Sequence, residues 1–246
     1  MKANRITNQC IKGMGPRKTM EDFGTSDASA DGQFFWFIVS DGIGGKPGGA
    51  IAAEVTVSTL NDYFKKHLSK VSQLEKEGFY KDGVAIVVDR LSERIREDAV
   101  LAEMGCTVCM AIFYGNRVFV SWSGDSRFYL FRNGACLWDS HPHNWSFDLY
   151  RKGVLTLEEA RLSETSYLTG SINSFSDAIR IDHQILMLQP DDRFVLCTDG
   201  IWALFEHPDF IQLLVGNGLS KTVSTLERQL LQYSNDNYLG FIAEFQ

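Results

Sequence analysis

Long hydrophobic segments and basic clusters are both missing from this chain of 246 residues. The longest apolar runs, 34–39 and 84–88, are far too short to cross a bilayer, and no signal-peptide core follows the first residues. The chain carries 24 Lys and Arg against 31 Asp and Glu, a net charge of -7, without a basic block suited to nucleic acid. We therefore expect a soluble, cytoplasmic protein that binds neither membranes nor nucleic acid. An anionic substrate would require bound cations to reverse the local charge.

Cysteine is scarce, and the five residues present are scattered along the chain. Only Cys106 and Cys109 are closely spaced, as in redox or zinc motifs. The segment around them is typical of a strand, in which such positions face opposite sides of the sheet. No second cysteine pair or histidine pair is present to complete a zinc site. We expect buried, unpaired thiols that pack as small apolar side chains.

A linker rich in proline and serine is also absent, as are internal repeats, so we expect residues 1–246 to form a single domain. Short apolar runs separated by tight turns dominate the chain, and Asn133-Gly134 is a strong hairpin signal. These runs predict antiparallel strands at 34–39, 107–114, 117–122, 128–131, 135–138, 185–188, 194–197 and 239–245. The run 34–39 is continuously apolar, which predicts burial on both faces of its strand.

Helical periodicity is present in three segments. Their apolar positions are Ala53, Val57, Leu60, Phe64 and Leu68; Val84, Val88, Leu91 and Ile95; and Val223, Leu226, Leu230 and Tyr233. The first two helices are adjacent in sequence, so we expect them to cover one sheet face together. Ser220 is the expected N-cap of the third helix. These elements predict an α+β fold in which two antiparallel β-sheets stack as a β-sandwich with helices on both outer faces.

A segment from about 141 to 168 interrupts this pattern with weak periodicity and little strand character. Within it, Thr156 followed by Glu159 fits a helix capping box. Long excursions from a core are usually functional. We therefore expect this segment to lie beside a functional site.

Acidic residues follow several of the predicted strands. They occur in Glu21-Asp22, Ser40-Asp41-Gly42, Gly124-Asp125-Ser126-Arg127, Thr198-Asp199-Gly200 and Asp236-Asn237. The units around Asp41 and Asp199 are nearly identical, and each places Asp-Gly where a buried strand ends. Two central strands that emerge at one edge would bring both carboxylates together, and each glycine would permit close backbone approach. Such a gathering of carboxylates favours a site for hard divalent cations.

The ordered motifs Arg-x-x-Met-Glu-Asp, Ser-Asp-Gly-Ile-Gly-Gly, Gly-Cys-Thr, Gly-Asp-Ser-Arg, Thr-Asp-Gly-Ile-Trp and Asp-Asn resemble the type 2C metal-dependent protein serine/threonine phosphatases. The similarity extends from about Lys12 to Phe245, and the segment from Tyr150 to Arg161 resembles the mobile flap of the bacterial members. The resemblance implies hydrolysis of phosphoserine and phosphothreonine in proteins by direct attack of a water that bridges two metal ions. It also implies phosphorylated protein partners, namely a cognate serine/threonine kinase and its targets.

Carried over residue by residue, the resemblance implies metal ligands at the strand ends. Asp41 would bridge two Mg²⁺ or Mn²⁺ ions, and Asp199 and Asp236 would complete the shell of one of them. The carbonyl of Gly42 would bind the other ion. A third, weaker ion would use Asp125 together with Asp199.

The same resemblance implies catalytic roles for Arg17, Glu21 and Asp22. Glu21 and Asp22 would hold metal-bound waters from behind the direct ligands. Arg17 would bind the substrate phosphate, because a guanidinium fork matches phosphate oxygens. Four departures concern other positions. Ile43 replaces a histidine of many eukaryotic members, and Gly170 replaces an arginine usual near the end of the flap. Met20 and Lys46 stand where many bacterial members have asparagine and histidine.

Other interpretations share these motifs. Asp125 and Arg127 could simply form an ion pair within a turn. The chain could be a catalytically silent regulatory domain that binds a partner through the flap, although every expected carboxylate is present. It could also hydrolyse small phosphorylated metabolites, because function depends on the site rather than on the fold.

Overall fold

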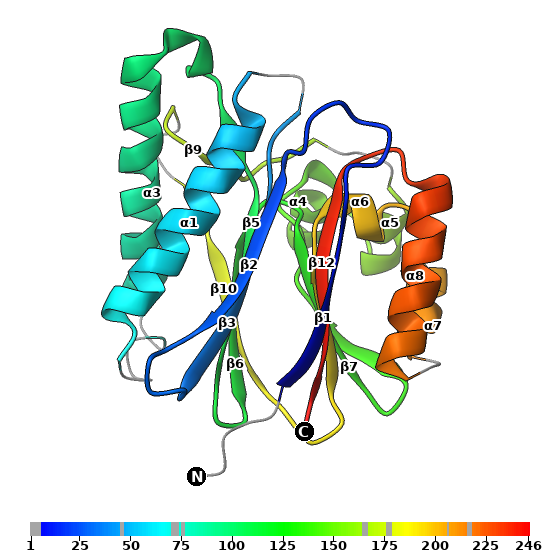
Figure 1. The fold of residues 1–246 in the computed structure, drawn as a ribbon. Helices are drawn as coiled ribbons and strands as arrows, with labels where there is room; N and C mark the ends of the chain where they lie inside the picture. The colour runs from blue at the N-terminus through cyan, green and yellow to red at the C-terminus, as the bar shows by residue number, and fades with distance from the viewer. Residues whose placement is uncertain are drawn as a thin grey trace.

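Two antiparallel sheets face each other in the computed structural model, which describes residues 6–44, 47–69, 74, 77–163, 167–175, 179–205, 207–215 and 218–246 (Figure 1). The first sheet has the strand order β1 (Ile6–Gly13), β12 (Tyr238–Phe245), β11 (Arg193–Cys197), β7 (Arg127–Arg132) and β8 (Ala135–Asp139). The second has the order β10 (Asp182–Met187), β6 (Arg117–Ser123), β5 (Val108–Tyr114), β3 (Phe34–Asp41) and β2 (Asp22–Ala28). The short strands β4 (Gly105–Cys106) and β9 (Ile172–Asn173) pair separately.

Helices cover the outer face of each sheet (Figure 1). Helices α1 (Gly49–His67) and α3 (Glu77–Glu97) pack on the second sheet, and α7 (His207–Val215) and α8 (Leu219–Tyr233) pack on the first. The remaining helical elements are α4 (Trp145–Arg151), α5 (Leu157–Leu162), α6 (Asp199–Trp202) and the 3-10 turn Ala99–Leu101. The predicted α+β sandwich is therefore confirmed. Within the described ranges, no helix combines the length and the hydropathy needed to cross a membrane.

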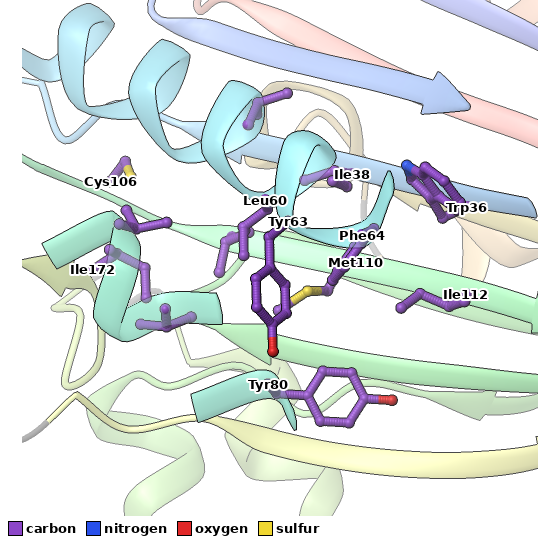
Figure 2. Packing of buried hydrophobic residues seen from close by; sticks show 14 of the residues in the cluster. Trp36, Ile38, Leu60, Tyr63, Phe64, Tyr80, Cys106, Met110, Ile112 and Ile172 are labelled. Carbon is purple, nitrogen blue, oxygen red and sulfur yellow. The ribbon is translucent and has the colours of Figure 1, made fainter. Parts of the chain in front are cut away.

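Strand β3 is buried on both faces, as its continuous apolar run predicts. Trp36 and Ile38 point toward α1, where they pack with Leu60 and Phe64 of that helix (Figure 2). Phe37 and its alternate neighbours instead point into the space between the sheets. Because successive strand residues face opposite sides, one strand contributes to two hydrophobic layers.

Aromatic rings fill the space between the two sheets. The ring of Phe194 on β11 lies 4.6 Å from Phe113 and 5.6 Å from Phe37, centroid to centroid. The Phe37 ring also lies 5.0 Å from that of Phe241 on β12. These side chains are almost completely buried, so their packing fixes how the strands of one sheet lie over those of the other.

Several local predictions are confirmed. The predicted strands are all present, and the Asn133-Gly134 turn has positive φ at both residues, as a tight hairpin requires. Thr156 and Glu159 form the predicted capping box of α5. Cys106 and Cys109 are buried, free and directed into different hydrophobic layers.

Two outer strands were missed, and one predicted helix cap is wrong. Strands β1 and β2 were missed because they are outer strands with few apolar residues. Ser220 is not the N-cap of α8, which begins at Leu219 after Gly218. Leu219 is buried against the first sheet, and this packing extends the helix past the expected cap, so Ser220 accepts a hydrogen bond from Gln9 instead.

We expect Phe37→Ala to lower the free energy of unfolding by about 3–5 kcal/mol, because it leaves a cavity between the sheets. Phe175→Ala is the matched control, since that side chain is 61% exposed and its loss should change stability by less than about 0.5 kcal/mol. Urea unfolding of both variants measures the difference. Equal effects would show that the intersheet layer does not carry the stability assigned to it.

Candidate metal centre and phosphate-binding site

Carboxylates from both sheets meet at one end of the sandwich. Asp22 begins β2 and Asp41 ends β3, and the two residues are direct cross-strand partners. Asp199 begins α6 directly after β11 of the other sheet. The carboxyl groups of Asp41 and Asp199 lie within hydrogen-bonding reach of each other. The two Asp-Gly units therefore meet at one end of the sandwich, each from a different sheet.

The glycines of the two Asp-Gly units permit this close approach. A Cβ atom at Gly42 would lie 2.3 Å from the backbone carbon of Gly49, and one at Gly200 would lie 1.8 Å from the carbonyl oxygen of Asn237. Both distances are below any tolerable contact, so a side chain at either position would displace the backbone beside the carboxylates. The sequence-based expectation of close approach is confirmed at both sites.

Asp22 is anchored to the opposite sheet by Thr198. The Thr198 hydroxyl donates a hydrogen bond of 2.7 Å to Asp22 Oδ2 and accepts one of 3.0 Å from the Leu239 amide. The Glu21 amide donates to Asn237 Oδ1 at 2.7 Å, which fixes the residue just before Asp22. No local sequence pattern indicates these contacts of Thr198 and Asn237, although each residue adjoins one of the acidic residues.

Arg17 and Asp236 form an ion pair at the exposed side of this end. The Arg17 guanidinium lies 2.6 Å from Asp236 Oδ2, and the two side chains are 50% and 33% exposed. Arg17 Nε also donates to the Asn235 carbonyl. The structure thus brings the predicted phosphate-binding residue into contact with a predicted metal ligand.

Asp125 lies on the enclosed side, in the turn that precedes β7. Its backbone carbonyl accepts a 3.0 Å hydrogen bond from the indole of Trp202, which belongs to the same helix as Asp199. The hydroxyl of Thr107 lies 2.7 Å from that of Ser126 and accepts a hydrogen bond from the Asp41 amide. Asp125 is therefore tied through backbone and side-chain contacts to the strand ends that carry Asp41 and Asp199.

The predicted flap segment, about residues 141–168, is docked against the same turn. The His143 amide donates to the Gly124 carbonyl at 2.8 Å, and the Gly124 amide donates to His143 Nδ1. A Cβ atom at Gly170 would lie 2.6 Å from His143 Nδ1, so the imidazole excludes a side chain at this position. The fully buried His143 side chain therefore occupies the space that a side chain at position 170 would need.

Burial and mutual repulsion perturb these carboxyl groups. Burial raises the pKa of Asp22 to about 7, and Asp199 adds to the rise against a hydrogen bond from Thr198. Burial, followed by the charge of Asp199, raises the pKa of Asp125 to about 7. The pKa of Asp41 is raised well above its ordinary value by burial and then by Asp199, Asp22 and Asp125, and burial also raises the pKa of Asp199.

This donor set fits a hard divalent cation. Oxygen ligands are those that Mg²⁺ prefers, and a cation among these carboxylates would relieve their repulsion. In the described ranges, no group of three or more His, Cys, Asp and Glu side chains is already arranged to hold a metal ion. Mg²⁺ commonly binds through one or two carboxylates and keeps several waters.

Known proteins share extended sequence similarity with this chain. The family model described as protein phosphatase 2C matches residues 19–232. The serine/threonine phosphatase Stp of Listeria welshimeri is 26% identical over 177 residues, which cover 72% of this chain and 70% of that protein.

Solved structures show the same fold. A serine/threonine phosphatase of S. agalactiae superposes with a TM-score of 0.85 at 22% identity, covering 98% of this chain and all of the other. The catalytic domain of the phosphatase PstP, solved with two manganese ions, gives a TM-score of 0.79 at 19% identity with 98% of each chain covered. The fold is that of these phosphatases. The chain belongs to the protein phosphatase 2C family.

Without metal, we expect Asp22→Asn to gain stability relative to the unsubstituted protein as the pH rises from about 4 to about 7. The reason is that the pKa of Asp22 is about 7 in the fold against 3.8 ordinarily, so the folded state binds more protons in this window and loses stability as they dissociate. Thermal unfolding in a chelator measures the difference, with the exposed Asp209→Asn as control. A stability gap that shrinks with rising pH would contradict the raised pKa.

Proposed function

We propose that residues 1–246 act as one catalytic domain that hydrolyses phosphoserine and phosphothreonine in proteins with Mg²⁺ or Mn²⁺. The convergence of buried carboxylates from both sheets carries this proposal. Pairing of β1 with β12 supports a single domain, because it joins segments from opposite ends of the described chain. The relatives named serine/threonine phosphatase support the substrate class.

The residues of the acidic end divide into roles by position. Asp41, Asp199, Asp236 and the Gly42 carbonyl would hold two ions, and Asp125 with Asp199 would hold a third. When bound, these ions would acidify a water molecule and stabilise charge on the transferred phosphoryl group.

Glu21 and Asp22 would act behind the direct ligands. Asp22 already accepts a hydrogen bond from Thr198, so its carboxylate is oriented before any ligand binds. Such outer residues orient bound waters and tune their acidity.

Arg17 would bind the phosphate at the exposed side of the site. Arg17 forms an ion pair with Asp236, which is a proposed metal ligand. A bound phosphate would replace the Asp236 carboxylate as the partner of the guanidinium and would therefore lie beside an ion. A guanidinium binds two phosphate oxygens through a rigid planar fork, which the ammonium group of lysine lacks.

The proposed partners are phosphorylated proteins in the cytoplasm, namely a cognate serine/threonine kinase and its targets. Exposed apolar side chains on and next to the flap support a protein substrate, because they offer contact area beside the acidic end. They include Trp145, Val154, Leu162 and Tyr167.

We expect Asp41→Asn and Asp199→Asn each to lower kcat on a phosphothreonine peptide by more than about 100-fold, beyond the usual loss for residues behind the ligands. The control is Asp62→Asn on the exposed face of α1, which should retain full activity. Phosphate release is measured with and without Mn²⁺. Unsubstituted protein that binds Mn²⁺ but releases no phosphate from the peptide or an aryl phosphate would identify a silent domain. Faster turnover of small metabolites than of the peptide would instead favour a metabolite phosphatase.

Arg17→Lys should raise KM for the phosphopeptide about tenfold while changing kcat less, because one charge-assisted hydrogen bond to phosphate is worth about 1.5 kcal/mol. Steady-state kinetics with the peptide measures both constants. An unchanged KM would assign Arg17 only to its ion pair with Asp236.

A further inference from the structure

Arg127 is a buried cation near the acidic end. It begins β7 opposite Cys197, and only 6% of the residue is exposed. Its Nε atom is buried without a hydrogen-bond partner, and its Nη1 atom donates to the Tyr129 hydroxyl at 3.3 Å. Burying a charge in this way is costly unless the surroundings compensate it. The ion pair considered from the sequence, between Arg127 and Asp125, is not among the ion pairs of the described residues.

Two aromatic rings hold the guanidinium instead. Its central carbon lies 3.7 Å from the centre of the Trp202 ring and 5.9 Å from that of Phe147. Trp202 belongs to α6, which Asp199 begins, and Phe147 belongs to α4 of the flap. A planar guanidinium stacks on such rings in a way that an ammonium group does not.

The same indole reaches Asp125 directly. Trp202 stacks on Arg127 through its ring face and donates its Nε1 hydrogen to the Asp125 carbonyl at 3.0 Å. Arg127 therefore fixes the orientation of the Trp202 indole, and the indole in turn holds the Asp125 backbone. Its positive charge also opposes the repulsion between Asp125 and Asp199.

We propose that Arg127 is a positioning residue that, through Trp202, holds the Asp125 carboxylate beside Asp199 and so sets the affinity of this side of the acidic end for a divalent cation. The inference rests on the proposed function for the identity of that ion. Arg127 contacts neither substrate nor ion in this role. It acts through its contacts with the rings of Trp202 and Phe147.

The test is Mn²⁺ binding by isothermal titration calorimetry, which requires no turnover. Asp125→Asn should remove the weaker class of Mn²⁺ sites. Arg127→Lys, which keeps the charge but loses the planar stack, should weaken that class about tenfold, as substitutions behind metal ligands do. The stronger class, assigned to Asp41 and Asp199, should change less than about twofold because its ligands are untouched. The control is Arg90→Lys, on the exposed face of α3.

A double-substitution cycle separates positioning from general damage. In the Asp125→Asn background, Arg127→Lys should have no further effect on Mn²⁺ binding. Trp202→Phe, which keeps an aromatic ring but loses the indole hydrogen, should reproduce the weakening and carries the test if Arg127→Lys does not fold. Four results would each overturn the inference. Arg127→Lys could leave the Mn²⁺ isotherm unchanged, or weaken both classes of site equally. The losses from Arg127→Lys and Asp125→Asn could be additive, or the unsubstituted protein could show no weaker class of Mn²⁺ site. A chain that shows the predicted isotherms but hydrolyses no phosphopeptide would refute the proposed function and leave this inference intact.

Discussion

Mutual repulsion among buried carboxylates is the constraint around which this end of the molecule is organised. Strands from both sheets bring Asp22, Asp41, Asp125 and Asp199 together, and burial, with the charges of neighbouring carboxylates added to it, raises their pKa values. The aromatic layer between the sheets offsets the unfavourable free energy of this repulsion, because its packing holds the two sheets together. A sandwich held firmly at its centre can thus present carboxylates that would separate if they were free to move.

The groups around the carboxylates have unequal freedom. On the exposed side, Arg17 is held only by Asp236 and the Asn235 carbonyl, so a phosphate can compete for its guanidinium. On the enclosed side, Arg127 is clamped by aromatic rings and Asp125 is tied to α6 and the flap turn. This difference fits a site whose open side admits substrate while its closed side maintains the ligand geometry.

The sequence was sufficient for the elements whose signal lies in their own residues. The apolar run of β3, the periodicity of α1 and the capping box at Thr156 each predicted local structure correctly. It was insufficient for β1 and β2, whose polar residues become strands only because a neighbouring strand pairs with them. Ser220 is likewise not the cap because of a tertiary contact: the burial of Leu219 decides where α8 begins.

At the acidic site, too, the sequence indicated only the features that local patterns carry. The Asp-Gly repeats and their order indicated which carboxylates converge, but not that they approach from facing sheets. The roles of Thr198 and Trp202 depend on contacts between distant segments, which no local pattern encodes. Likewise, Arg127 looked like a partner for Asp125, and only the tertiary packing shows that it stacks on Trp202.

The most direct test of the account is a crystal structure of the protein soaked in Mn²⁺, with anomalous scattering used to locate the ions. The account predicts anomalous peaks within bonding distance of the Asp41 and Asp199 carboxylates, with several water ligands around each ion. Peaks confined to other surfaces, or none at this end at saturating Mn²⁺, would contradict the claim that these buried carboxylates exist to hold divalent cations.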